Sequence, residues 1–106
     1  STDGFLRLAD VLPEAMLLLT SSGEVMAANR AARSAFAIPE PTRLPCSLRN
    51  LLHNGSDDFE EYLLLCARSS SLIPATFTFQ TRNGPSVPYR CEGAFYQKLA
   101  DTLGPR

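Results

Sequence analysis

The feature that most constrains this fold is a change of hydrophobic period near residue 73. Apolar residues there occupy every second position: Ile73, Ala75, Phe77 and Phe79 alternate with Thr76, Thr78, Gln80 and Arg82. A period of two predicts a half-buried β-strand, because successive side chains of a strand point to opposite faces. A second alternating run follows the turn residues Asn83-Gly84-Pro85 and extends from Val87 to Tyr96. The two runs predict an antiparallel hairpin.

A second hairpin is predicted near the start of the chain. Residues 15–20 form a continuous apolar run of strand length, residues 21–23 supply a turn, and residues 24–28 form the second strand. An uninterrupted apolar run indicates a first strand that is buried on both faces. Gly23, at the turn, has a structural role in this interpretation.

Helices are predicted between the hairpins. Asn29 precedes an alanine-rich segment, 30–37, and is placed to act as its N-cap. Prolines interrupt residues 39–45, and residues 47–53 resume as about two helical turns that end at Asn54-Gly55. The strongest helical pattern covers residues 56–68, where acidic residues crowd the first turns and a basic residue lies at the end, as the helix dipole favours.

An amphipathic helix is predicted ahead of the first hairpin, over residues 1–12, with the remaining residues 13–106 forming the main domain. Its apolar stripe consists of Phe5, Leu8, Ala9 and Leu12, and Pro13 ends it. The sequence allows two interpretations of the stripe. It either pairs with the same helix of a second copy or packs on the chain's own sheet.

Composition excludes several functional classes. The net charge is −1 with scattered basic residues, which argues against a nucleic-acid partner. The longest apolar run is far shorter than the roughly 20 residues of a membrane span. The cysteines are Cys46, Cys66 and Cys91, an odd number without paired spacing. This pattern favours reduced thiols in the cytoplasm over a disulfide framework or a zinc site.

Several of these segments together resemble a PAS domain. The resemblance rests on four features. Residues 12–15 lead into a strand, and Gly23 lies at the turn that follows. A strand from Val25 ends in Asn29 and continues as Arg-Ala-Ala, and residues 53–58 connect to the long helix. The likeness spans roughly residues 8–96. It implies an α+β fold in which a curved antiparallel sheet carries short helices on one face.

The PAS resemblance also implies a fifth strand at the centre of the sheet, formed by the end of the domain. Residues 97–106 show no strand pattern, so we expect this strand to be truncated or absent here. Open strand edges invite pairing with another chain. We therefore expect a homodimer, formed through the N-terminal helix or an open sheet edge.

The function that the resemblance implies is that of a sensory module in a larger signal-transduction protein, such as a two-component sensor histidine kinase or a diguanylate cyclase. Such a module binds a small molecule or a partner and relays a conformational change, and this chain alone is not an enzyme. The alternative is a ligand-free dimerisation or protein-interaction module.

The side chains expected to face a PAS-type ligand pocket come from most of the predicted elements. They are Met16, Leu18, Phe36, Leu52, Phe59, Leu63, Phe77, Phe79, Tyr89 and Cys91, with Tyr89 or Arg90 as polar handles. The competing interpretation is that the same residues simply fill the hydrophobic core.

Cofactor and catalytic patterns are weak. His53 is the single histidine and stands where a helix ends, which argues against a haem ligand. Cys46 lacks the flanking residues of flavin-adduct PAS domains. A Cys46–His53 pair assisted by Asp57 or Asp58 lacks an oxyanion motif, so a nucleophilic enzyme is not expected. The sequence leaves the cofactor, if any, unidentified.

Overall fold

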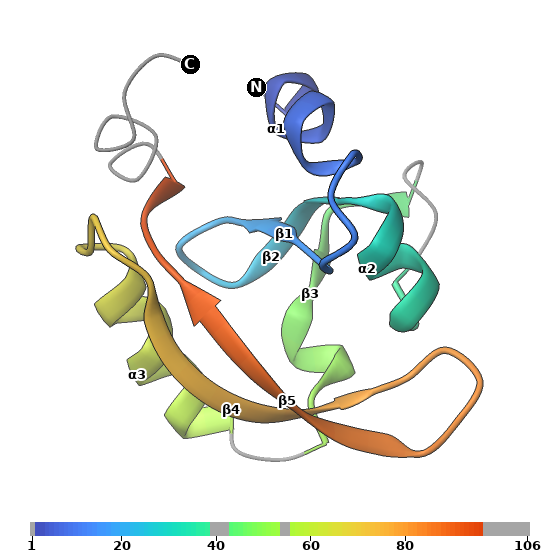
Figure 1. Cartoon of the computed structure of the whole chain (residues 1–106). Helices are drawn as coiled ribbons and strands as arrows, with labels where there is room; N and C mark the ends of the chain where they lie inside the picture. The colour runs from blue at the N-terminus through green and yellow to red at the C-terminus, as the bar shows by residue number, and fades with distance from the viewer. Residues whose placement is uncertain (1, 39–42, 54–55, 97–106) are drawn as a thin grey trace.

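Two antiparallel sheets form the framework of the protein (Figure 1). The computed structural model describes residues 2–38, 43–53 and 56–96. One sheet contains β1 (Leu17–Leu19), β2 (Glu24–Ala28) and β3 (Cys46–Ser47) in that order, and the other pairs β4 (Ile73–Gln80) with β5 (Ser86–Gly93). The helices are α1 (Thr2–Ala9), α2 (Arg30–Ala35), the 3-10 helix η2 (Leu48–Leu51) and α3 (Ser56–Cys66). The predicted α+β class is confirmed.

The C-terminal hairpin is confirmed in position and in orientation. Its register runs from the Ile73–Gly93 pair to the Gln80–Ser86 pair without interruption. Phe77 and Phe79 are buried, whereas Thr76 between the predicted inward positions is exposed. The alternation of the sequence therefore identified the face of β4 that meets the core.

The N-terminal hairpin is present, but the predicted burial of its first strand on both faces is wrong. All three residues of β1 are only half-buried, because β1 is the edge strand of its sheet. The register also shifts between Leu18, which pairs with Ala27, and Leu19, which pairs with Val25. This irregularity turns Val25 toward the main core and Ala27 toward the opposite face.

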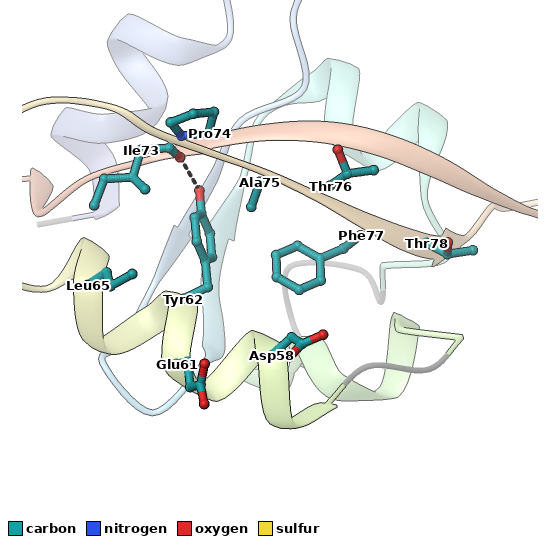
Figure 2. Close-up of a pocket in the computed structure, with 10 residues that line it drawn as sticks. All are labelled: Asp58, Glu61, Tyr62, Leu65, Ile73, Pro74, Ala75, Thr76, Phe77 and Thr78. Atoms are coloured by element: carbon teal, nitrogen blue, oxygen red, sulfur yellow. Dashed lines mark hydrogen bonds between the residues drawn. The ribbon is translucent and has the colours of Figure 1, made fainter.

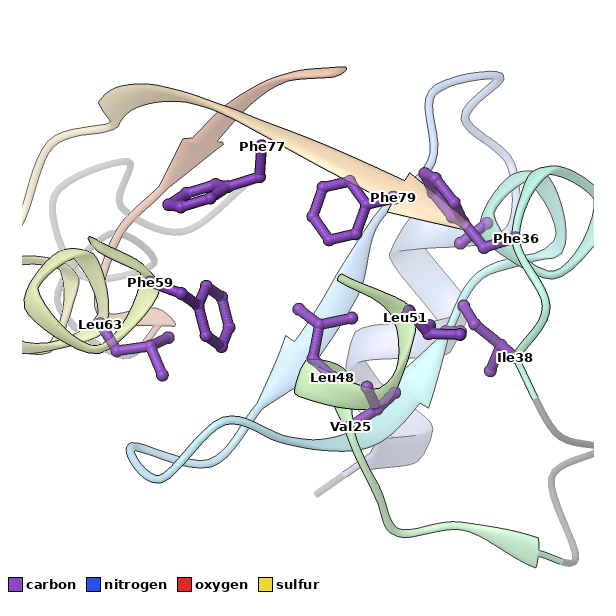
Figure 3. Close-up of a cluster of buried hydrophobic side chains, with 11 residues drawn as sticks. Val25, Phe36, Ile38, Leu48, Leu51, Phe59, Leu63, Phe77 and Phe79 are labelled. Carbon is purple, nitrogen blue, oxygen red and sulfur yellow. The ribbon is translucent and has the colours of Figure 1, made fainter. Parts of the chain in front are cut away.

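The single curved sheet implied by the PAS resemblance is not what the described residues form. Within these ranges no strand joins β1 to β5, and the two sheets remain separate. They are united by side-chain packing instead, because Val25 of β2 belongs to the same buried cluster as Phe77 and Phe79 of β4 (Figure 3). The predicted loss of the closing strand concerns residues 97–106, which lie outside the described residues.

The helices lie on more than one face. The main core takes Ala32 from α2, Leu48 and Leu51 from η2, and Phe59 from α3. In contrast, α1 packs on the other face of the first hairpin, against Ala27. The expectation of helices on one face therefore fails for α1, because the shifted register gives β2 apolar side chains on both faces.

Element ends differ by a few residues from the predictions. The first helix ends at Ala9, before Pro13, and the long helix ends at Cys66 instead of residue 68. Cys46 and Ser47 pair with β2, and the predicted two α-helical turns over 47–53 are one 3-10 turn. The predicted stop at Asn54-Gly55 lies outside the described residues. A two-residue strand is too short to leave a periodic signal.

Gly23 provides a test of the turn between β1 and β2. Its φ of +91° is unfavourable for other residues, and an added Cβ would lie 3.0 Å from Leu63 Cδ1 and 2.9 Å from Arg49 Nη1. We expect Gly23→Ala to lower the free energy of unfolding by about 1–3 kcal/mol in urea denaturation. Gly4→Ala is the matched control.

The control substitution lies within α1, where nothing approaches the added Cβ within 4 Å. There we expect a gain of up to about 1 kcal/mol, since alanine is the better helix former. If Gly23→Ala and Gly4→Ala changed the free energy of unfolding equally, the result would contradict the turn geometry.

Candidate functional site

Most of the predicted pocket residues pack against one another in the main core. Five are buried members of the cluster and three lie at its margin: Phe36, Phe59, Leu63, Phe77 and Phe79, then Leu52, Tyr89 and Cys91. Their rings interlock edge-on, with centroids 4.9 Å apart for Phe36 and Tyr89 and 5.6 Å apart for Phe59 and Phe77. This arrangement is that of a filled core.

The other two predicted pocket residues do not join this core. Met16 precedes β1 and is 36% exposed. Leu18 points to the opposite face of β1, where it packs with Phe5 and Ala9 of α1. Arg90, the suggested polar handle, is exposed and lies near Glu92. The structure therefore does not bring the predicted set together around one cavity.

A buried polar junction lies at Asn29, whose side chain is fully buried. Its Oδ1 accepts hydrogen bonds from the Ala32 N–H at 3.0 Å and from the Met16 N–H at 2.9 Å. Its Nδ2 donates to the Ala9 carbonyl at 2.9 Å and to the Glu14 carbonyl at 2.8 Å. The predicted N-cap is confirmed, but three of the four bonds go to the segment before β1 and to the end of α1.

Two contacts fasten α1 beside this junction. Phe5 and Ala9 are buried against Ala27 of β2. Asp10, directly after the helix, accepts a hydrogen bond from the Arg30 N–H at 2.7 Å and so adds a second cap to α2. Leu8 is 67% exposed. The predicted stripe is thus divided: Phe5 and Ala9 face the protein, whereas Leu8 and Leu12 face outward.

The three thiols are buried or half-buried, whereas the single histidine is exposed. Burial raises the pKa of the Cys46 thiol, which favours its protonated, weakly nucleophilic form. His53 is exposed, and its backbone N–H donates to the Thr78 carbonyl at 3.0 Å. Burial also raises the pKa values of Cys66 and Cys91. These two cysteines lie on the inner side of α3 and of β5, respectively, as small residues of the core region.

A groove lies between α3 and β4 (Figure 2). It has a volume of about 340 Å³ and is lined by residues 73–78 of β4 and by Asp58, Glu61, Tyr62 and Leu65 of α3. The Tyr62 hydroxyl donates to the Ile73 carbonyl at 2.7 Å. Burial, with Cys66 beside it, raises the pKa of Tyr62, so the hydroxyl remains a donor.

Arg49 is a structural residue that the sequence patterns did not single out. Its guanidinium donates to the Ser22 carbonyl at 2.6 Å, forms an ion pair with Glu60, and lies 5.7 Å from the centre of the Phe59 ring. It thereby joins the β1–β2 turn to α3. Its spacing from these partners, 27 and 11 positions, leaves no local signal in the sequence.

Other site types find no support in the described ranges. Within them, no group of three or more His, Cys, Asp or Glu side chains is placed to hold a metal ion, and no helix is long and apolar enough to cross a bilayer. Comparisons of the chain with protein-family models, with curated proteins and with solved structures find no match.

The Asn29 junction generates a stability test. We expect Asn29→Ala to lower the free energy of unfolding by about 2–4 kcal/mol, because it removes the partners of two buried and two part-buried backbone groups. Urea denaturation of the purified chain measures this loss. Asn50→Ala is the control, since Asn50 is exposed in η2. If both variants unfold at the same urea concentration, the junction does not contribute as its geometry implies.

Proposed function

We propose that this chain is a regulatory module of the PAS type that relays a signal through the attachment of α1, and that it is not itself an enzyme. The observation that carries the proposal is the Asn29 junction. A single buried side chain binds the end of α1, the segment before β1 and the start of α2. A change at any of these three elements therefore alters the hydrogen bonds of the other two.

A comparison of free energies supports α1 as the element that moves. Its apolar attachment consists mainly of Phe5 and Ala9, and burying one large apolar side chain contributes about 1.5–3 kcal/mol. The buried hydrogen bond from Asn29 to the Ala9 carbonyl adds about 1 kcal/mol, so the attachment contributes at most about 4 kcal/mol. Unfolding a whole domain requires about 5–15 kcal/mol. Because the first value is smaller, α1 detaches in a fraction of molecules while the two sheets remain folded. A partner that binds the attached or the detached state then shifts this population.

The packed core supports a protein partner over a small molecule as the signal. Eight of the ten predicted pocket residues already contact one another in or beside the main core. A ligand at that place would have to displace well-packed aromatic rings, which is costly. The order of elements, with a helix and a hairpin before α2 and a second hairpin after α3, supports the PAS-type assignment. A place within a larger signalling protein such as a histidine kinase or a diguanylate cyclase is part of the same proposal.

Hydrogen exchange tests the proposed movement of α1. We expect the amides of residues 6–9 to exchange about a hundredfold faster than those of Ala75, Phe77 and Phe79, the positions of β4 that face β5, since α1 opens without global unfolding. Asp10→Ala, which removes the second cap of α2, is expected to increase this difference about fivefold. Asp57→Ala, at an exposed position of α3, is the control and is expected to leave α1 unchanged. Nuclear magnetic resonance spectroscopy resolves the individual amides.

Two outcomes would contradict the proposal. Exchange of α1 at the same rate as β4 would show that the helix separates only when the whole domain unfolds. Release of a stoichiometric small molecule on denaturation of the purified chain would favour the ligand-binding function over the partner-driven one.

A second candidate function, dimerisation, is favoured by the outward side of the α1 region. Leu8 is 67% exposed, Val11 is 79% exposed and Leu12 is 43% exposed, within five positions of one another. Apolar side chains gathered in this way are typical of a contact surface. In this arrangement α1 keeps its attachment through Phe5 and Ala9 while its outer side meets the same helix of a second copy.

Sedimentation velocity over a concentration series tests the dimer. We expect Leu8→Glu to weaken self-association at least about tenfold, because it places a charge at the centre of the apolar contact. Leu64→Glu is the matched control, since Leu64 is 65% exposed on α3, a different helix. A chain that sediments as a monomer at all concentrations, or equal effects of both variants, would exclude the α1 dimer.

A further inference from the structure

The groove between α3 and β4 follows the edge of a strand. Six consecutive residues of β4, 73–78, line it from one side (Figure 2). Because successive residues of a strand point to opposite faces, a groove lined by all six runs along the strand's backbone edge and not over one face. Its opposite wall is α3, with Asp58, Glu61 and Leu65.

Among the described residues, none pairs with this edge of β4 over its N-terminal half. On one side β4 pairs with β5 along its full length. On the other side, the partners found among the described residues lie only toward the C-terminal end, where Leu52 pairs with Phe79 and Phe36 pairs with Thr81. The edge from Ile73 to Thr76 is therefore available to a further strand.

The hydrogen-bonding groups on this edge can be assigned because backbone groups along a strand point alternately to its two edges. The Thr78 carbonyl accepts from the His53 N–H, so the backbone of Thr78 faces away from β5. In an antiparallel pair such outward positions recur every second residue, which places Thr76 and Pro74 outward as well. Thr76 presents both an N–H and a carbonyl. Pro74 presents its carbonyl alone, since proline has no N–H.

The negative charge of the groove favours extended partner segments that carry basic side chains. Its lining contains the carboxylates of Asp58 and Glu61 and no Lys or Arg. Neither carboxylate takes part in the ion pairs found in the described part of the chain. Leu65, which is 49% exposed, and Ile73 add apolar surface beside them. Basic side chains on the face of the segment that meets α3 complement these carboxylates, and their aliphatic stems can pack on the leucine.

We propose that the α3–β4 groove binds an extended, basic segment of a partner protein, which adds as a third strand to the β4–β5 sheet. Backbone hydrogen bonds to Thr76 and Pro74 hold the segment, and its Lys or Arg side chains meet Asp58 and Glu61. Strand addition of this kind derives affinity from the main chain and specificity from alternate side chains. The groove would serve as an input surface for the proposed regulatory module, but its binding does not require α1 to move.

The test uses a fluorescein-labelled peptide of four Lys-Val repeats as the probe. Fluorescence anisotropy measures its binding to the whole chain, and amide chemical shifts locate the site. We expect the largest shifts at residues 73–78, and much smaller shifts in β2. The double variant Asp58→Asn, Glu61→Gln is expected to bind about fivefold more weakly, because two surface charge pairs are lost. Asp57→Asn, an exposed change on the same helix outside the groove lining, is the control.

A second peptide keeps the test independent of protein variants. The same repeats with a methyl group on every backbone nitrogen have no N–H to donate to the Pro74 and Thr76 carbonyls along either edge, and we expect their binding to be lost. Equal binding of the methylated peptide, or of Glu-Val repeats, would overturn the proposal, as would an equal loss in the Asp57→Asn control. Absence of binding at millimolar peptide would also overturn it. Concentration-dependent shifts at Thr76 without peptide would identify a second copy as the occupant instead.

The two proposals fail separately. Peptide titration measures binding to the α3–β4 groove, whereas hydrogen exchange measures how often α1 detaches. A groove that binds no peptide leaves the movement of α1 untouched, and a rigid α1 leaves the groove available.

Discussion

The arrangement of the whole N-terminal half depends on the four hydrogen bonds of one buried amide. Asn29 accepts from the Met16 and Ala32 backbones and donates to the carbonyls of Ala9 and Glu14. Burying an amide without partners is costly, whereas this one uses both donors and both acceptor positions of its side chain. The same bonds satisfy backbone groups at a helix end, a helix start and a strand approach, where regular structure provides none. Three chain segments thus have one common point of attachment.

Aromatic packing extends this organisation across the protein. Phe36 directly follows α2, the helix that Asn29 caps, and its ring lies 5.5 Å from that of Phe79. Phe79 lies 6.4 Å from Phe77, and Phe77 lies 5.4 Å from Tyr62. Tyr62 in turn lines the α3–β4 groove. The two sheets share no hydrogen-bonded strand in the described ranges, so these rings are a main link between them. The rings therefore connect the end of α2 with the α3–β4 groove.

The agreement between sequence and structure differs from element to element for physical reasons. The alternation of β4 predicted its buried face because that strand has one side on the core and one in solvent. The same reasoning failed for β1, whose three leucines suggested burial on both faces, because an edge strand keeps part of its surface in solvent. In β2 the register shift sends Val25 and Ala27 to opposite faces, which no period predicts. The candidate pocket was predicted residue by residue, yet most of its members fill the core.

Local chemistry in the sequence determined the hairpins, the cap at Asn29 and the α+β class, since each rests on neighbours within a few positions along the chain. Only the tertiary structure decided what those elements contact. The donors of Asn29 reach carbonyls 15 and 20 positions away, and Arg49 reaches the turn at Ser22. The α3–β4 groove likewise exists only because a helix and a strand pack side by side. Such contacts depend on how the chain closes around its core, and periodicity carries no information about partners that are distant in sequence.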